Sequence, residues 1–169
     1  MTTKEKLLAL LEDSKGTFFS GEEIARTLQV SRAAVWKAVN ALREDGYTID
    51  AVTNKGYRLS PESDILSPQG IRRFLKPEYR DLNLAVLPTV PSTNALVREK
   101  ANQGCPEGCV IIAREQTAGR GRYGRQFFSP ADTGVYLSLL LRPTAYSPQQ
   151  ATCLTAAAAA AMCQAIEAV

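Results

Sequence analysis

The first sixty residues change from helical to strand periodicity, and this change limits the folds that they can form. A leucine repeat predicts a helix over residues 3–13, and Ser20 and Ser31 are placed to cap a second and a third helix. The segment YTIDAVTNKGYRLS then predicts two short strands around a tight turn, at residues 47–52 and 56–59. Few folds combine three short helices with one terminal hairpin.

Helix, helix, tight turn, helix and hairpin is the order of a winged helix-turn-helix, in which the last helix enters the major groove of DNA. Val35, Val39 and Leu42 predict a buried stripe on the third helix, opposite a polar face. We predict DNA contacts from that face and from the wing, at Arg32, Ala33, Trp36, Lys37, Asn40, Lys55 and Arg58. A protein-interaction module of the same fold is the alternative, and Trp36 alone is equally compatible with a packing role.

Residues 60–67 are rich in proline, serine and acidic side chains, which predicts a boundary between a domain at 1–62 and another at 67–169. In the second part, LNLAVLP, CVIIARE and GVYLSLLLR predict strands, the second of them central and the third also buried. A helix follows a cap at Ser92 or Thr93, and an alanine-rich helix begins near Ser147. The alternation predicts a mixed α/β layer, with the thin alanine helix able to lie close to the sheet.

The segment GRGRYGRQFFSP, residues 119–130, predicts a loop that binds an anion. Its GxGxxG spacing lacks the following helix of a dinucleotide site, the lysine of a kinase and the Gly-Lys-Ser/Thr of a P-loop. Arg120, Arg122 and Arg125 supply many N–H donors, and the glycines let backbone amides approach a ligand closely. We predict that the loop becomes ordered around an anionic ligand. An exposed basic turn and an arginine-glycine loop for nucleic acid are the alternatives.

Composition excludes several classes of chemistry. The chain contains no histidine, which rules out a Ser-His-Asp triad and a Cys/His zinc site, and we predict no metal site within the protein itself. Cys105, Cys109, Cys153 and Cys163 form no CxxC pair and are expected to be thiols. The net charge of +3 is uninformative about partners. Without a signal peptide or a long apolar run, we expect a cytoplasmic protein that does not contact membranes.

The loop GRGRYGRQFFSP, preceded by REQTAG and followed by VYLSLLL, resembles the signature of biotin–protein ligases. PSTN upstream matches a second segment of that family, and residues 20–59 resemble the DNA-binding domain of its two-function members, the biotin operon repressors. The resemblance runs from about residue 5 to the end. It implies an α+β protein: an N-terminal winged helix-turn-helix, then a mixed α/β ligase domain of the biotin/lipoate-ligase, class II synthetase-like type.

The resemblance also implies a reaction. Biotin and ATP, the latter with Mg²⁺, form biotinyl-5′-AMP and pyrophosphate, and the biotinyl group passes to a lysine of the biotin carboxyl carrier protein of acetyl-CoA carboxylase. The ligand-bound protein forms a homodimer on operator DNA and represses biotin genes. A non-enzymatic winged-helix regulator that senses a small acid or its adenylate, and a lipoate-type ligase, are the alternatives.

Position in the family motifs assigns the site residues. The resemblance implies that Ser92, Thr93 and Asn94 bind the biotin head group with Gln116 beside them, although helix capping also explains the first two. It implies that Arg120, Gly121 and Arg122 follow the biotinyl and phosphate groups, with the two arginines catalytic. Both arginines and Gly121 would also bind nucleotide, as would Arg125 and Phe127, the latter in the place of the family's tryptophan. Core packing is the alternative for Phe127 and Phe128.

The family's catalytic lysine lies in a lysine–tryptophan–proline–asparagine–aspartate run after the alanine-rich helix. This sequence reaches Val169 without that run. We therefore expect the chain to be the N-terminal part of a longer ligase, truncated at its C-terminal side and inactive by itself.

Overall fold

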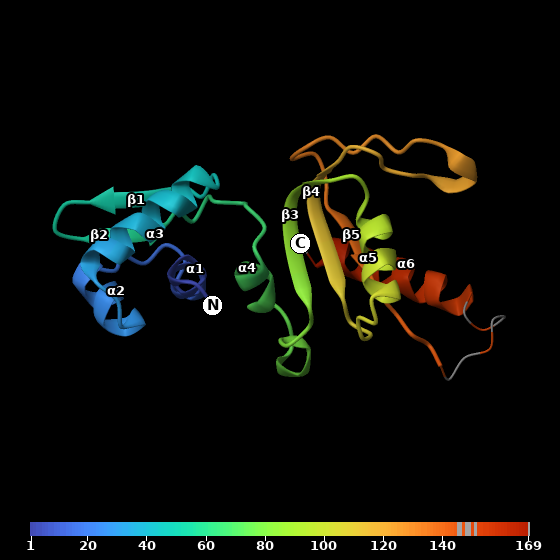
Figure 1. Cartoon of the computed structure of the whole chain (residues 1–169), viewed down its shortest axis with the longest axis horizontal. Helices are drawn as coiled ribbons and strands as arrows, with labels where there is room; N and C mark the ends of the chain where they lie inside the picture. The colour runs from blue at the N-terminus through green and yellow to red at the C-terminus, as the bar shows by residue number, and fades with distance from the viewer. Residues whose placement is uncertain (145–146, 148–149, 151, 169) are drawn as a thin grey trace. The chain divides into compact units, whose positions relative to one another are not determined.

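A computed structural model describes residues 1–144, 147, 150 and 152–168. The chain divides into two compact units, Met1–Val86 and Leu87–Val169 (Figure 1). This division falls later than the domain boundary predicted from composition, because the segment after residue 60 packs on the first helix. The assignment of residues 1–62 and 67–169 to two domains stays a prediction.

Three helices build the core of unit 1, and each begins at a residue whose side chain caps it. They are α1 (Thr3–Asp13), α2 (Gly21–Leu28) and α3 (Arg32–Glu44), as predicted. Thr2 and Glu5 form a reciprocal capping box on α1, while Ser20 and Ser31 accept from backbone amides of α2 and α3. Their apolar faces meet in one fully buried cluster with the hairpin, comprising Leu7, Leu11, Ile24, Val35, Val39, Leu42, Ile49 and Leu59.

The hairpin consists of β1 (Ile49–Val52) and β2 (Gly56–Leu59), paired antiparallel with Ile49 opposite Leu59. A backbone bridge between Phe19 and Tyr57 fastens it to the segment before α2. Gly56 makes this bridge possible. Its φ is +97°, and an added Cβ would lie 2.0 Å from the carbonyl oxygen of Phe19.

The segment after the hairpin stays attached to α1. Ser67 caps α4 (Pro68–Arg72), and its Oγ donates to the buried carboxylate of Glu12 at 3.0 Å. Arg73 lies 3.8 Å from the same carboxylate, and Lys15 donates to the carbonyl of Ser63. Ser67 and Arg73 thus satisfy a carboxylate that burial would otherwise penalise. A short 3₁₀ turn, η1 (Pro77–Tyr79), completes the segment.

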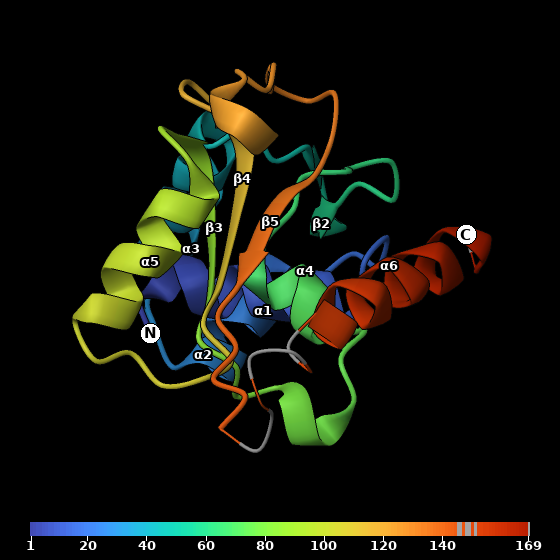
Figure 2. The same ribbon diagram turned by 90° about the vertical axis from the view of Figure 1, so that its right-hand side faces the viewer.

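A three-stranded sheet with strand order β3-β4-β5 organises the second part of the chain (Figure 2). The elements are β3 (Leu84–Val90), α5 (Thr93–Asn102), β4 (Val110–Gln116) and β5 (Tyr136–Leu139). β4 is central, as predicted, and its first four residues are buried. β5 pairs antiparallel with β4, with Val110 opposite Leu139. The predicted stop of α5 is confirmed, since Gly104 follows it with a φ of +83°.

The prediction that GVYLSLLLR is a buried strand was wrong. Only Tyr136–Leu139 form β5, and Leu137 and Leu139 are 53% and 45% exposed. β5 is an edge strand of the described sheet, and it alternates exposed leucines with half-buried residues. The apolar run that suggested a buried strand includes leucines on an exposed face of β5.

The alanine-rich helix α6 (Thr152–Glu167) begins later than predicted, because Ser147 is not helical. Predicted helix positions 148, 149 and 151 lie outside the described residues. From Cys153 to Ala168 every side chain is exposed except that of half-buried Leu154, so α6 does not lie close to the sheet. Alanine has the highest intrinsic helix propensity, which favours a helix here although few of its side chains are buried. No helix in the described ranges is both long and apolar enough to cross a membrane.

Candidate functional site

The outer face of α3 and the hairpin enclose a groove of about 680 Å³ in unit 1. Arg32, Ala33 and Trp36 line one side, and residues 51–54 with Gly56 and Tyr57 line the other. Trp36 is 58% exposed, which confirms the predicted solvent face and removes the packing alternative. Lys37 is exposed on the same helix and Asn40 is half-buried. The structure thus brings the predicted helix residues to one surface beside the wing.

The wing residue Arg58 is engaged within the protein. Its Nε donates to Asp50 on the opposite strand at 2.7 Å, and its guanidinium lies 4.6 Å from the centroid of the Phe18 ring. Lys55 at the wing tip is exposed, with Nζ 6.0 Å from the same centroid. A DNA contact by Arg58 stays a prediction, and it would compete with these contacts.

In unit 2, the N-terminus of α5 meets the end of β4. Ser92 caps α5 and is buried, and Thr93 is only 4% exposed. The Thr93 amide donates to Gln116 Oε1 at 2.8 Å, and the Thr93 hydroxyl donates to the same oxygen at 3.2 Å. The structure therefore places Thr93 and Gln116 in direct contact. Asn94 points away from them: it is exposed and accepts from Arg98 on the next turn at 3.5 Å.

The arginine-glycine loop extends beyond the end of β4 (Figure 2) and closes on itself by backbone bonds. Phe127 N–H donates to Gly119 at 2.9 Å, and Gly121 N–H donates to Arg125 at 2.8 Å. Between them Arg122–Gly124 form a short 3₁₀ turn, η2, with Tyr123 at a φ of 59°. The loop is a small bridged hairpin with three arginines on its rim.

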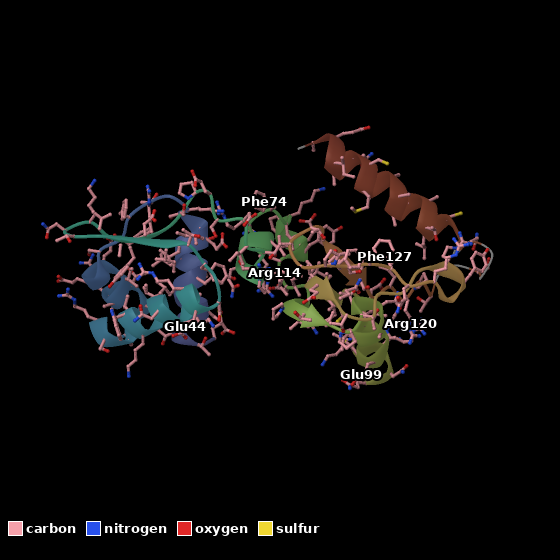
Figure 3. The ribbon with its side chains drawn as sticks, turned by 90° about the horizontal axis from the view of Figure 1, so that it is seen from above. Glu44, Phe74, Glu99, Arg114, Arg120 and Phe127 are labelled. Carbon is pink, nitrogen blue, oxygen red and sulfur yellow. The ribbon has the colours of Figure 1, made fainter. Side chains whose placement is uncertain are left out.

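The predicted anion-binding residues lie on this hairpin and face solvent. Arg120, Arg122 and Arg125 are exposed, and none forms an ion pair within the described part of the chain. Arg120 and Phe127 come from the two arms of the hairpin (Figure 3). Phe127 is 57% exposed and Phe128 is 87% exposed, so the core-packing alternative was wrong for both.

A pocket of about 450 Å³ lies at the base of the hairpin, between residues 115–119 and 126–130. Gln116 and Phe127 both line it, whereas Ser92, Thr93, Arg120 and Arg122 do not. On one flank Arg114 pairs with Asp132 at 2.7 Å, and on the other Thr89 donates to Glu115 at 2.8 Å. These contacts fix the end of β4 on both sides of Gln116.

Two serines that the motif did not point to complete the polar cluster. Ser129 is 2% exposed and accepts from Gln116 Nε2 at 3.1 Å, and Ser138 on β5 lies 2.9 Å from the Thr93 hydroxyl. The sequence offered one signal for each: Ser129 follows two phenylalanines near the end of the loop, and Ser138 stands between two leucines of its strand. Both serines lie far from Thr93 in the sequence, so the sequence did not indicate that they join the same polar cluster.

The cysteines do not add to either site. No disulfide joins the four, all of which the structure describes. Burial raises the pKa of the Cys109 thiol, with a smaller contribution from a hydrogen bond to Cys105. Within the described ranges, no group of three or more histidine, cysteine, aspartate or glutamate side chains could hold a metal ion.

The fold and these two surfaces define an α+β chain in which a helix-turn-helix unit precedes an α/β unit with an exposed arginine-rich loop. Comparison with known families gives the same two parts: residues 3–58 match the HTH domain model, and residues 86–169 match the biotin/lipoate A/B protein ligase family. The chain therefore combines an HTH domain with a domain of the biotin/lipoate A/B protein ligase family.

The names of the curated relatives combine a ligase with a repressor. The chain is 41% identical to Bifunctional ligase/repressor BirA of Bacillus spizizenii over 99% of this chain and 51% of that protein. It is 41% identical to the Bacillus subtilis protein of that name over 98% of this chain and 51% of the relative. The Escherichia coli one is 38% identical over 83% of this chain and 42% of the relative. The chain thus spans about half the length of the curated relatives that it matches.

Proposed function

We propose that the full-length protein is an ATP-dependent biotin–protein ligase that also represses transcription. The observation that carries the ligase proposal is the contact between Thr93 and Gln116 at the base of the arginine hairpin. It joins the two segments that motif position assigns to the biotin head group. The alternative of a regulator without enzymatic activity does not account for this cluster or for the similarity to named ligases.

The substrates are biotin and ATP, and the chemistry explains the charge of the hairpin. The biotin carboxylate must attack the α-phosphate of ATP, and both groups are anionic. Arg120 and Arg122 would offset this repulsion and stabilise the charge that spreads in the transition state. Gly121 leaves room between them, and Arg125 would bind the nucleotide. Phe127 is exposed at the pocket and would stack on adenine.

Thr93, Gln116 and Ser92 would form the polar end of the biotin site, where a ureido ring needs hydrogen-bond partners in an otherwise apolar pocket. Asn94 faces away from Gln116, so a direct contact with biotin would require it to turn. ATP would bring Mg²⁺ to the site. The ion would be held mainly by the phosphates and water, since the described residues contain no cluster of protein ligands.

The product of the first step would be biotinyl-5′-AMP, and the second step would transfer biotin to a lysine of the biotin carboxyl carrier protein of acetyl-CoA carboxylase. Ordering of the hairpin over the adenylate would shield its mixed anhydride from water. The test is biotin-dependent exchange of labelled pyrophosphate into ATP by the full-length protein, with lipoate in a parallel reaction. Exchange with lipoate alone would indicate a lipoate-type ligase, and exchange with neither would refute the ligase proposal.

For the repressor function, we propose that the ligand-bound protein forms a homodimer on a two-fold symmetric operator, with α3 in the major groove. Directly adjacent half-sites would separate the recognition helices by about 34–36 Å or a multiple, and by more if the wings lie between them. The test is an electrophoretic shift of promoter DNA from its own biotin genes, with biotin and ATP present. DNA that never shifts would refute the repressor proposal and leave the ligase proposal intact.

A further inference from the structure

Ser129 is the most buried polar residue among those that the structure describes in unit 2, and it lies between Gln116 and the arginine hairpin. Its Oγ accepts from Gln116 Nε2 at 3.1 Å and donates to the carbonyl of Phe127 at 3.2 Å. The backbone carbonyl of Ser129 accepts from the backbone N–H of Gln116 at 3.0 Å. A single residue with 2% exposure therefore contacts both the side chain and the backbone of Gln116.

The hydrogen bonds determine the orientation of the Gln116 side-chain amide. The backbone N–H of Thr93 can only donate, so the atom 2.8 Å from it must be the oxygen Oε1. The Thr93 hydroxyl also donates to Oε1, which leaves Ser138 as the donor to Thr93. Nε2 then faces Ser129, so the Ser129 hydroxyl proton must go to the Phe127 carbonyl.

The result is one directional chain of hydrogen bonds, from Ser138 through Thr93, Gln116 and Ser129 to Phe127. Both acceptor positions of Oε1 are used, and one N–H of Nε2 is used. One N–H therefore remains for a hydrogen-bond acceptor on a ligand, such as a ureido carbonyl. Without Ser129, the amide could rotate, and this N–H would lose its fixed direction.

The same chain ends where the hairpin closes. Phe127 N–H donates to Gly119, and an added Cβ on Gly119 would lie 2.4 Å from the Phe127 carbonyl oxygen and 2.7 Å from Ser129 Oγ. Ser129 thus holds the Phe127 carbonyl at the point where the arm that leads to Arg120 begins. An anchor at this point fixes the origin of the arginine arm relative to Gln116.

We propose that Ser129 is a positioning residue for the biotin site: it aims the free N–H of Gln116 at the ligand and fixes the base of the arginine hairpin. This inference rests on the proposed ligase function and adds a residue outside the motif-assigned set. It predicts that Ser129 affects biotin affinity through Gln116, although no hydrogen bond joins Ser129 directly to Thr93.

A double-mutant cycle on the full-length protein tests this coupling, with biotin affinity measured by titration calorimetry. We expect Ser129→Ala to weaken biotin binding about tenfold, because a buried N–H loses its partner and the amide its orientation. In a Gln116→Met background, Ser129→Ala should change affinity less than twofold. Equal tenfold losses in both backgrounds would overturn the proposal, since a merely structural role predicts additive effects.

Thr89→Val is the matched control. It also removes a hydroxyl hydrogen bond at the end of β4, to Glu115, but it leaves the chain of hydrogen bonds from Ser138 to Phe127 intact. It should leave biotin affinity unchanged, and an equal loss there would also overturn the proposal. If Ser129→Ala does not fold, Ser129→Cys enters the same cycle with nearly the same volume and weaker hydrogen bonds. Wild-type protein that binds no biotin would instead refute the proposed function.

A second readout separates the two effects of Ser129. Amide hydrogen exchange at Gly119–Phe127 should accelerate in Ser129→Ala before ligand is added, because the Phe127 carbonyl loses its anchor. Gln116→Met should not accelerate it to the same extent, since Ser129 keeps its bond to Phe127. Identical exchange in wild type and Ser129→Ala would contradict the role at the hairpin base.

Discussion

The guanidinium of Arg58 lies 4.6 Å from the ring centroid of Phe18, which joins the wing to the segment before α2. Stacking of this kind contributes about 0.5–1 kcal/mol at exposed sites. The ion pair with Asp50 holds the guanidinium in the same place. Arg58, which the sequence predicts to contact DNA, therefore also positions the wing of unit 1.

This relationship predicts how operator binding responds to wing mutations. If Arg58 keeps its contacts with Asp50 and Phe18 on DNA, Arg58→Ala should weaken binding several-fold and leave the slope of log affinity against log salt unchanged, because no phosphate contact would be lost. Phe18→Leu should give the same weakening without altering charge. The measurement is a binding titration by fluorescence anisotropy at several salt concentrations. A slope reduced by about one would return Arg58 to the phosphate role predicted from the sequence.

Lys37 gives the opposite expectation. It is exposed on α3 and forms no ion pair among the described residues, so it is available to a phosphate. Lys37→Ala should weaken binding to all sequences about equally and reduce the salt slope by about one. Lys6→Ala, an equally exposed lysine on α1, is the control and should change neither. An unchanged slope for Lys37→Ala would exclude a phosphate contact.

Gly56→Ala should destabilise the DNA-binding unit by about 2–4 kcal/mol, because a positive φ disfavours alanine and the added Cβ meets the Phe19 carbonyl. Chemical denaturation of unit 1, followed by Trp36 fluorescence, measures the change. Gly21→Ala is the matched control, since its Cβ would lie 3.6 Å from the Tyr57 ring, at ordinary contact distance. Equal stabilities of the two variants would mean that the bridge between Phe19 and Tyr57 is dispensable.

Arg120→Ala in the full-length protein should reduce adenylate formation by about 10²–10³, because its guanidinium would stabilise charge that develops in the transition state. The fold should stay intact, because the side chain is exposed. Pyrophosphate exchange measures the first effect, and release of free adenylate measures the loss of shielding by the hairpin. Lys100→Ala on α5 is the control and should exchange at the wild-type rate. Two results together would indicate a basic turn without catalytic function. They are normal turnover by Arg120→Ala and amide hydrogen exchange at residues 117–126 that biotin and ATP do not change.

The cysteines should differ in their response to pH. Cys109 is 1% exposed and burial raises the pKa of its thiol, so its thiolate should become significant only at a higher pH than is usual for a cysteine. Cys153 and Cys163 are exposed to reagents. Alkylation followed by peptide mass spectrometry at pH 7 to 9 should label the two exposed cysteines first. Labelling of Cys109 at the same rate and pH would show that the start of β4 opens readily.

The sequence determined the elements whose signals are local. Ser20, Ser31, Ser67 and Ser92 are found as helix caps because a cap depends only on the following three residues. The stripe of Val35, Val39 and Leu42 determined which face of α3 is buried, and therefore that Trp36 is exposed. The relationship to biotin–protein ligases was likewise readable, because the loop and the PSTN segment are short motifs in a fixed order.

Tertiary structure decided what depends on residues far apart in the chain. The leucines of β5 read as buried, but burial of a strand face depends on what covers it, which no local pattern records. The sequence predicted a DNA contact for Arg58, and only the fold shows that Phe18 and Asp50 lie next to its guanidinium. Ser129 and Ser138 lie 36 and 45 positions from Thr93, and the motif segments that contain them gave neither serine a role. Only the meeting of α5, β4, β5 and the hairpin joins them into one chain of hydrogen bonds, because a hydrogen bond is defined by distance in space and not by position in the sequence.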